Sequence, residues 1–262
     1  MGQVMDNLKL MKNVRDLESP QTLLELIAGM EQHMALYQSG IQEIRTKLEI
    51  LQRDARFGEG HNPIDSIKSR IKSPMSIIEK MYRKGFPISL DSMRANLNDV
   101  AGIRVICPFI EDIYTVAQML TRQDDLVVIK EKDYIKNPKS NGYRSYHLVL
   151  QVPVFLSDRK EMVRVEVQLR TIAMDFWASL EHQIHYKTSC EVPDSVVDEL
   201  KQCADIIAQT DERMQQLSKQ IRCFNAQPTS EGGEEAQEHP LGSLISASVV
   251  GIAGGMAGSH ND

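Results

Sequence analysis

Apolar residues recur at intervals of three and four through the first part of the chain, which is the spacing of an amphipathic helix. The pattern predicts one long helix over residues 21–57, with Gly40 as a candidate break. Residues 58–63 (GEGHNP) end this helix, because glycine and proline disfavour its continuation. The helical spacing returns over residues 64–84, where Pro74 is expected to begin a new helix.

The middle of the chain changes to short apolar runs and alternating patterns that are typical of strands. Four strands are predicted there, at residues 103–107, 126–134, 145–152 and 162–170. Further helices are predicted at residues 111–122, 171–187 and 193–222. This order predicts an α+β fold with α/β-like features, in which flanking helices cover a single mixed β-sheet of about five strands.

The predicted strand at 162–170 alternates most regularly, with apolar and polar side chains on opposite faces. Its apolar face consists of Val163, Val165, Val167 and Leu169. Its polar face consists of Arg164, Glu166, Gln168 and Arg170. A polar sheet face is either solvent-exposed or the floor of a site, and exposure to solvent is the commoner case.

Charge is unevenly distributed, so the net charge of −6 describes the folded part poorly. No Lys or Arg follows Arg222, whereas five of the 36 acidic residues do, which leaves residues 1–225 with 30 basic and 31 acidic residues. A nearly neutral domain is not expected to bind nucleic acid broadly. Local basic clusters can still hold a small anion.

Composition divides the chain into three parts. Residues 1–20 form a polar N-terminal extension, residues 21–225 a single domain, and residues 226–262 a tail that is first acidic and then rich in Gly, Ala and Ser. The tail is expected to be disordered. Its uncharged stretch at 241–259 has glycines at G-x-x-x-G spacing, so membrane contact or self-association is the less favoured alternative.

Four cysteines, Cys107, Cys190, Cys203 and Cys223, include no C-x-x-C pair, so a zinc or redox motif is unsupported. Cys107 lies in an apolar run and is expected in the core. The first fifteen residues are polar, unlike a signal peptide. These features predict a reduced, cytoplasmic protein.

Residues 130–147 combine cations with aromatic rings around a glycine-marked turn. Lys132 and Lys139 precede Tyr143 and His147, and strand alternation places the last two on the same face. A tyrosine ring can stack on a base while lysines and a histidine contact its phosphates. The segment is therefore a candidate site for a phosphorylated aromatic ligand, although a structural tyrosine with a surface histidine is an equal alternative.

Asp99 and Glu166 are candidate metal ligands. Asp99 precedes the predicted strand 103–107, and Glu166 lies on the polar face of the strand at 162–170. Carboxylates at the ends of neighbouring strands can hold Mg²⁺, which keeps the rest of its coordination shell for phosphate and water. An acidic pair of this kind is a weak signal by itself.

Neither common glycine-rich phosphate loop is present, so side chains would have to hold a nucleotide. Residues 64–84 offer a hydroxyl and several cations for this purpose, namely Arg70, Lys72, Ser76, Lys80, Arg83 and Lys84. Taken alone, these residues are more typical of a solvated helix face.

Four motifs together resemble the synthetase domain of RelA/SpoT-type alarmone synthetases. They are DVAGIRVIC at 99–107, GYRSYH at 142–147 after the lysine-bearing segment, VEVQLRT at 165–171 and AMDFWASLEH at 173–182. The resemblance covers about residues 41–222, and the chain length is similar to that of the small, stand-alone members. The stretch GHNPIDSIKSRIKS at 60–73 looks closer to the RelP-type subgroup than to the RelQ-type.

The resemblance implies a nucleotidyltransferase-like domain that transfers the β,γ-pyrophosphate of ATP to the 3′-hydroxyl of GDP or GTP and releases AMP. It implies that Asp99 and Glu166 bind Mg²⁺ and that Glu166 also accepts the hydroxyl proton. The residues implied for ATP are Arg70 and Arg104 around the adenine, with Lys72, Ser76 and Lys80 at the phosphates. Those implied for the acceptor are Tyr143 stacked on guanine, Asp175 at the guanine edge, Lys132, Lys139 and His147 at the phosphates, and Gln168 lining the site.

The resemblance further implies a synthetase without hydrolase activity, because the His-Asp dipeptide of bifunctional relatives is absent from the sequence. Family members of this size form homotetramers, and the long amphipathic helices are consistent with self-assembly. Basic positions of the allosteric alarmone site in RelQ-type relatives fall on Glu49 and Gln52 here, which disfavours alarmone activation.

Two other functions stay open from the sequence. One is a related pyrophosphotransferase that uses an adenine nucleotide or tRNA as the acceptor. The other is a nucleotide-binding regulator without catalysis. Asp175 and the lysine-bearing segment favour a guanine nucleotide, with GDP and GTP equally open, and the pair Asp99 and Glu166 disfavours a protein that only binds.

Overall fold

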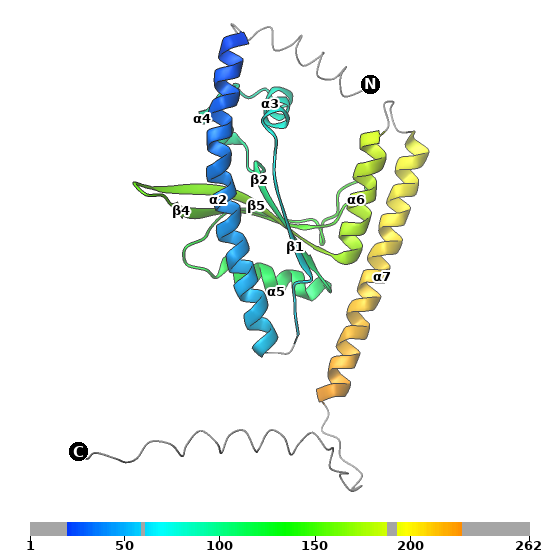
Figure 1. Cartoon of the computed structure of the whole chain (residues 1–262). Coiled ribbons are helices and arrows are strands. Elements are labelled where there is room, and N and C mark those ends of the chain that lie inside the picture. Colours follow the sequence, from blue (N-terminus) through cyan, green and yellow to red (C-terminus); the bar gives the residue numbers. More distant parts are fainter. Residues whose placement is uncertain (1–19, 59–60, 188–192, 227–262) are drawn as a thin grey trace, which may run out of the picture. The chain divides into compact units, whose positions relative to one another are not determined.

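The computed structural model of the chain describes residues 20–58, 61–187 and 193–226 (Figure 1). The predicted polar extension and tail, including the uncharged stretch at 241–259, fall almost entirely outside the described residues, so these boundaries stay predictions. Contacts divide the chain into Met1–Gln220 and Ile221–Asp262. The first unit contains the sheet and the candidate site.

The helices and strands follow the predicted order of helix, strands with an intervening helix, and helices. In chain order they are α2 (Pro20–Gly58), β1 (Ser66–Ile71), α3 (Pro74–Arg83), α4 (Leu90–Asn96), β2 (Ala101–Cys107), α5 (Ile110–Thr121), β3 (Val127–Asp133), β4 (Tyr146–Phe155), β5 (Lys160–Thr171), α6 (Ile172–Lys187) and α7 (Asp194–Ala226). None of the helices in the described part of the chain is long and apolar enough to cross a membrane.

The five strands form one mixed sheet in the order β1-β2-β5-β4-β3. Strands β2 and β5 run parallel, and the other three neighbouring pairs run antiparallel. The predicted single mixed sheet of about five strands with flanking helices is confirmed. The central strand, β5, is the alternating segment that the sequence marks most clearly.

The predicted helix at 64–84 is wrong in its first half, which forms β1. This strand pairs with β2 from Ser66 opposite Ile106 to Ile71 opposite Ala101. A six-residue segment with two isoleucines carries little periodicity of its own, so pairing with β2 decides its conformation. The second half is a helix that begins at Pro74, as predicted.

Two smaller features differ from the sequence prediction. Helix α2 continues through Gly40 without a break. The seven-residue helix α4 was not predicted, because it is too short to show a clear period. The side chain of Ser89 caps α4 by accepting a hydrogen bond from the backbone N–H of Ser92 at 3.1 Å.

The main core lies between α2 and the sheet (Figure 1). The four side chains on the core face of β5, from Val163 to Leu169, are at most 3% exposed, as the alternation predicts. Ile41, Ile44 and Leu48 of α2 and Cys107 of β2 belong to the same buried cluster. Burial of each large aliphatic side chain contributes about 1.5–3 kcal/mol, so this face of the sheet supplies much of the stability.

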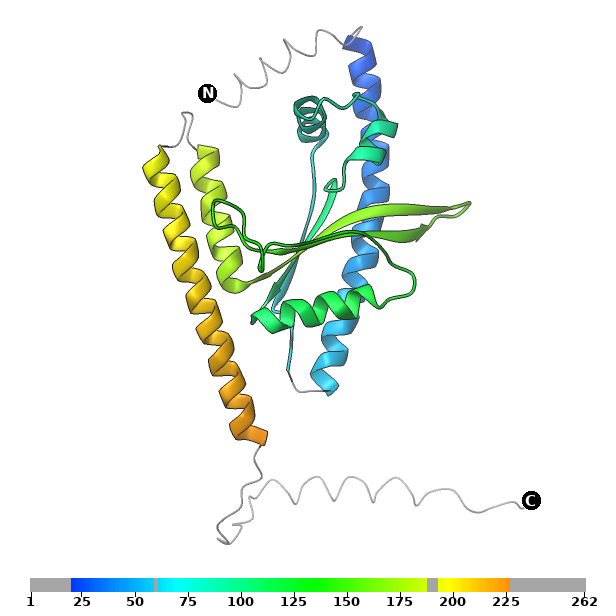
Figure 2. The same cartoon turned by 180° about the vertical axis from the view of Figure 1, so that it is seen from behind.

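Helices α6 and α7 lie side by side in both views of the molecule (Figures 1 and 2). Trp177, Ala178 and Ala204 form a second buried cluster between them, and Tyr143 packs against it. Gly142 has a φ of +86°, and a Cβ added there would lie 2.5 Å from the Cβ of Ala204. Glycine is therefore needed at this turn both for its backbone conformation and for its contact with α7.

Gly40 brings α2 close to β5. A Cβ at position 40 would lie 2.7 Å from Cγ1 of Val163, well inside normal contact distance. We predict that Gly40→Ala lowers the free energy of unfolding by about 1–2 kcal/mol, because overpacking outweighs the gain in helix propensity. Urea denaturation measures this change.

Gly29→Ala is the matched control in the same helix. Its Cβ would meet the flexible end of Leu90, with the nearest atom at 3.0 Å, so the gain in helix propensity is expected to dominate. Equal destabilisation of both variants would contradict the packing explanation.

Candidate active site

The register of the sheet organises its polar face, because residues paired across neighbouring strands point to the same side. One row crosses all five strands through Lys132, His147, Gln168, Arg104 and Lys68. The next row places Gly102 between Glu166 and Arg70. The strand pairing thus brings together side chains from distant parts of the sequence.

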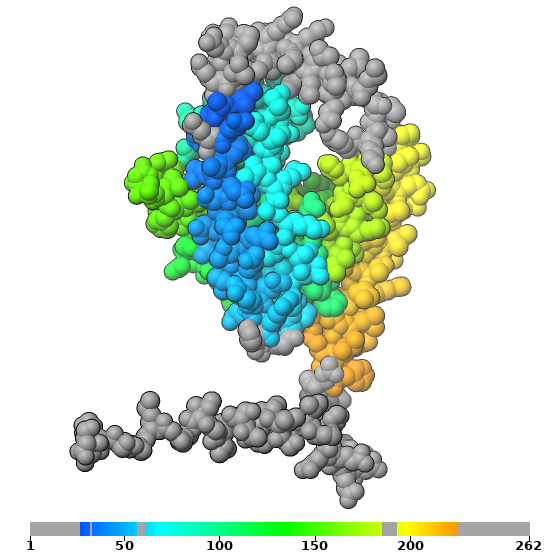
Figure 3. Space-filling model, in the orientation of Figure 1, coloured from blue at the N-terminus to red at the C-terminus, as the bar shows by residue number. Residues whose placement is uncertain are grey.

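A cavity of about 520 Å³ lies on this polar face. Figure 3 shows the surface hollowed between the cyan residues of β1 and α3 and the yellow-green residues of α6. The predicted site residues that line the cavity are Arg70, Asp99, Arg104, Tyr143, Glu166 and Gln168. Gly102 keeps the floor open, since a Cβ there would meet the backbone oxygen of Arg70 at 3.7 Å and nothing closer.

Asp99 precedes β2, as predicted, and lies between two lysines. The Nζ atoms of Lys72 and Lys80 are 2.6 and 2.7 Å from its Oδ2 and Oδ1. Burial raises the pKa of Asp99, but the hydrogen bonds and charges of the two lysines outweigh burial, so this pKa lies below its usual value. Asp99 is therefore ionised at neutral pH.

Glu166 is the second ionised carboxylate of the cavity. Its Oε2 accepts a hydrogen bond from Nε2 of Gln168 at 2.9 Å, and its Oε1 lies 3.4 Å from Nδ1 of His147. Burial and the like charge of Asp99 raise the pKa of Glu166. The two neighbours Gln168 and His147 lower it by more, so the pKa lies below its usual value.

The two carboxylates suit a hard cation. In the described part of the chain, no group of three or more His, Cys, Asp or Glu side chains is arranged to hold a metal ion. The buried Oδ1 of Asp99 lacks a hydrogen bond of normal geometry, although Lys80 is in contact with it. An ionised pair with such an oxygen fits Mg²⁺, which takes its remaining ligands from phosphate and water.

Arg170 connects several site residues, although the sequence analysis assigned it no role. It is 4% exposed, and its Nη1 donates to Oδ1 of Asp175 at 3.1 Å. Its Nη2 donates to the hydroxyl of Tyr143 at 2.8 Å and to Oε1 of Gln168 at 2.9 Å. A role for Arg170 could have been predicted from its position, two residues after Gln168 on the polar face of the strand at 162–170.

These hydrogen bonds favour one arrangement of protons around the ring of a neutral His147. Glu166 is an acceptor, so Nδ1 of His147 carries a proton toward it. The hydroxyl of Tyr143 accepts from Arg170, which leaves its own proton for Nε2 of His147 at 2.8 Å. When His147 is neutral, this hydrogen-bonded chain favours the tautomer that donates through Nδ1 to Glu166.

Asp175 is 9% exposed and faces three cations. Its Oδ1 lies 3.0 Å from Arg104 and 3.1 Å from Arg170, while its Oδ2 faces Lys68 at 3.8 Å. The predicted role of Asp175 at a guanine edge stays a prediction. Of its two oxygens, Oδ2 is the less engaged, because its one charged neighbour, Lys68, lies at the longest of the three distances.

The lysine-bearing segment lies against the aromatic residues of the site. Nζ of Lys139 is 4.4 Å from the centroid of the Tyr143 ring, and Nζ of Lys132 donates to the hydroxyl of Tyr134 at 3.0 Å. The ring of Tyr134 contacts both Tyr143 and His147. Ser76 lies at the start of α3, where its hydroxyl accepts a hydrogen bond from the hydroxyl of Ser73 at 3.0 Å, and its predicted role at the ATP phosphates stays a prediction.

Known proteins are similar to this chain in sequence and in architecture. A family model described as "Region found in RelA / SpoT proteins" matches residues 69–191. The chain is 43% identical over 209 residues to GTP pyrophosphokinase YwaC of Bacillus subtilis, a match that covers 80% of this chain and 98% of the relative. The chain belongs to the RelA/SpoT family.

Solved structures of the RelA/SpoT family agree with this assignment. Small alarmone synthetase 2 from Bacillus subtilis is 44% identical to this chain, with a TM-score of 0.67. The match covers 73% of this chain and 98% of that one. Small alarmone synthetase 1 from Bacillus subtilis, bound to its product pppGpp, is 34% identical with a TM-score of 0.69, covering 74% and 98%. The predicted resemblance and fold class are confirmed, whereas the RelP-type subgroup stays a prediction.

The hydroxyl of Tyr143 is expected to set the tautomer of His147 in this RelA/SpoT protein. Tyr143→Phe keeps the ring but removes the group between Arg170 and His147, so Nε2 loses its donor. We predict that ¹⁵N NMR of the neutral ring shows the Nδ1–H tautomer of His147 in the wild type and a mixture of the two tautomers in the variant.

The signal of His147 is assigned by its loss in His147→Gln. Tyr134→Phe is the matched control, because it removes a hydroxyl whose hydrogen bond goes to Lys132. An unchanged His147 spectrum in Tyr143→Phe would show that Glu166 alone sets the tautomer.

Proposed function

We propose that this RelA/SpoT protein is a (p)ppGpp synthetase, which transfers the pyrophosphate of ATP to the 3′-hydroxyl of GDP or GTP and releases AMP. The observation that carries the proposal is one cavity in which Asp99, Glu166, Tyr143 and a cluster of arginines and lysines converge. The names of its relatives support it, since YwaC is a GTP pyrophosphokinase and small alarmone synthetase 1 binds pppGpp as its product.

Pyrophosphate transfer depends on alignment and charge neutralisation more than on covalent help from the protein. Bound Mg²⁺, held by Asp99 and Glu166, would supply part of the neutralising charge. Lys72 and Lys80 supply more, because both ammonium groups already lie beside Asp99 and can turn to phosphate oxygens. Arg70 and Arg104 line the same cavity and are proposed to enclose the adenine.

Glu166 is proposed to accept the proton of the 3′-hydroxyl. Its lowered pKa keeps it ionised at neutral pH, so it is ready to act as a base and as a metal ligand. Gln168 and His147 donate toward its two oxygens and so hold the carboxylate in one orientation. Arg170 fixes Gln168 in turn, which makes it a positioning residue.

The acceptor nucleotide is proposed to lie on the side of Tyr143. Its ring can stack on guanine, and Lys139 is already within cation–π distance of it. Lys132, Lys139 and His147 are proposed to contact the acceptor phosphates. Oδ2 of Asp175 is proposed to accept from the guanine N1–H and 2-amino groups, a pair of donors that adenine does not present.

Further properties of the family are also proposed for this chain: a cytoplasmic, RelP-type synthetase without hydrolase activity that forms a homotetramer. Self-association is supported by helix α7, where Ile206, Met214 and Leu217 are at least 50% exposed and lie within one face of the helix. A second copy of the chain would cover such an apolar stripe. Solution scattering of the full chain measures the assembly.

The synthetase activity is tested with purified protein, Mg²⁺, ATP labelled at the γ-position, and GDP or GTP in turn. We expect the label to move to the guanine nucleotide with release of AMP. We also predict that Glu166→Gln lowers the rate by about 100-fold or more, because it removes a base and a metal ligand together. ATP binding is expected to be partly retained, which calorimetry measures.

Glu161→Gln is the matched control on the same strand, since Glu161 pairs with Arg94 and Arg159 away from the cavity. Its activity should equal that of the wild type. Continued synthesis by Glu166→Gln would exclude the proposed role of Glu166, and absence of transfer by the wild type would favour another acceptor or a binding role.

Asp175 is expected to determine base selectivity. We predict that Asp175→Asn reduces the preference for GDP over ADP by about tenfold or more, measured as the ratio of kcat/KM values. Both individual values should also fall, because Asp175 neutralises Arg104 and Arg170. The ratio is therefore the decisive quantity.

Asp205→Asn serves as the control, because Asp205 is half exposed and lies 3.9 Å from its partner Arg144. It should leave the GDP-to-ADP ratio unchanged. The same ratio in Asp175→Asn and the wild type would rule out Asp175 as the reader of the guanine edge.

A further inference from the structure

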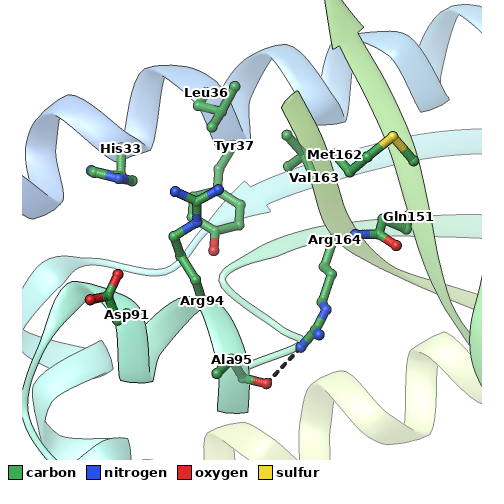
Figure 4. A pocket seen from close by; sticks show the side chains of 10 residues that line it. All are labelled: His33, Leu36, Tyr37, Asp91, Arg94, Ala95, Gln151, Met162, Val163 and Arg164. Carbon is green, nitrogen blue, oxygen red and sulfur yellow. Dashed lines mark hydrogen bonds between the residues drawn. The ribbon is translucent and has the colours of Figure 1, made fainter. Parts of the chain in front are cut away.

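A second cavity of about 320 Å³ lies among α2, α4 and strands β4 and β5 (Figure 4). It shares no lining residue with the active-site cavity. Its polar side chains are His33, Tyr37, Asp91, Arg94, Gln151 and Arg164. Its size is at the lower end of small-molecule sites in proteins.

Tyr37 is a buried phenol whose hydroxyl faces this cavity. The side chain is 6% exposed, and no hydrogen bond within the described part of the chain satisfies the hydroxyl. Figure 4 shows the hydroxyl directed into the space between Arg94 and Arg164. Burial raises the pKa of Tyr37, while the charges of both arginines act in the opposite direction, which agrees with this placement. Tyr37 therefore presents an unused donor to the cavity.

Arg164 forms no ion pair with a carboxylate within the described part of the chain. Its Nη1 donates to the backbone oxygen of Ala95 at 2.7 Å and to Oδ1 of Asn98 at 3.2 Å. Both partners are neutral, and Nη2 and Nε remain for a ligand. Arg94 has a carboxylate partner in Glu161 at 3.0 Å. Asp91 lies on the far side of Arg94 from Arg164 (Figure 4).

We propose that this cavity binds a small oxyanion, the phosphate or carboxylate group of a small molecule, through Arg94, Arg164 and the hydroxyl of Tyr37. Guanidinium groups match the paired oxygens of such anions, and the phenol supplies a further donor. Leu36 and Val163 give the cavity apolar walls for the remainder of the ligand.

Arg164 also connects this cavity to the proposed active site. It donates hydrogen bonds to Ala95 and Asn98, which precede Asp99 by four residues and by one residue, and it lies two residues from Glu166 on β5. An anion that fixes Arg164 therefore stabilises the segment that carries Asp99. The regulatory meaning of this link rests on the proposed function, whereas binding of the anion does not.

Binding is tested by calorimetry of the full chain with sulfate, inorganic phosphate and succinate, which separates phosphate-type from carboxylate ligands. We expect saturable binding of at least one of them by the wild type. Arg94→Gln and Tyr37→Phe should each weaken it, the first by about tenfold or more. Lys160→Gln is the control of equal charge change, because Lys160 lies near the same hairpin but outside the cavity.

Binding that is equally strong in Arg94→Gln and the wild type would place the anion elsewhere and overturn the proposal, as would no binding of any of the three. Circular dichroism of the folded variants separates lost binding from lost structure. Arg94→Gln lies on α4 and Tyr37→Phe on α2, so the binding test remains possible if one of the two variants does not fold.

The link to Asp99 is tested by hydrogen exchange of residues 95–100. The bound anion is expected to slow exchange there in the wild type and in Lys160→Gln, but not in Arg94→Gln or Arg164→Gln. Equal protection in Arg164→Gln would exclude Arg164 as the link. Neither measurement uses synthesis of a product, so failure of the proposed function would be seen separately in the transfer assay.

Discussion

The pairing of β5 with β2 on one side and β4 on the other is the constraint on which the rest of the structure depends. Because side chains alternate along a strand, one register sends Val165 and Val167 to the core beneath α2 and Glu166 and Gln168 to the cavity. A slip of one residue would bury the carboxylate and expose the aliphatic face. Burial of the aliphatic side therefore also fixes the geometry of the site, and stability and chemistry share one register.

Charge compensation follows from that register. The polar face gathers arginines and lysines from β1, β2 and β5, and such a cluster repels itself unless carboxylates lie within it. Asp175 forms ion pairs with Arg104 and Arg170, and Asp99 forms ion pairs with Lys72 and Lys80. The contacts with Lys72 and Lys80 lower the pKa of Asp99 and keep it ionised despite its burial. The charges of the site are therefore nearly balanced and already partly removed from water. Bound phosphates and a cation can replace these ion-pair partners with little further desolvation of the side chains.

Hydrogen bonding then sets the details that charge leaves open. Arg170 is buried, and its donors are shared among Asp175, Gln168 and Tyr143. Gln168 contacts Glu166, the proposed catalytic base, whereas Tyr143 and Asp175 are the proposed contacts of the acceptor nucleotide. One guanidinium therefore orients residues at both ends of the proposed reaction. Helices α6 and α7 support this arrangement from outside, because Tyr143 packs against the cluster of Trp177, Ala178 and Ala204. Ala204 of α7 also leaves no room for a Cβ at position 142. A rigid outer layer of this kind is what keeps a site within reach of its productive geometry.

The sequence was sufficient to predict the long helix α2, the alternation of β5, the family and the residue types of the site, because each depends on local periodicity or on a contiguous motif. It could not determine β1, whose conformation comes from pairing with β2, and so it placed Arg70 on a helix instead of a strand. Nor could it assign a role to Arg170 or find the cavity around Tyr37, since their partners are distant in the chain. Tertiary structure decided which charges meet and which donors stay unused, because only the packed sheet fixes distances between side chains that the sequence keeps apart.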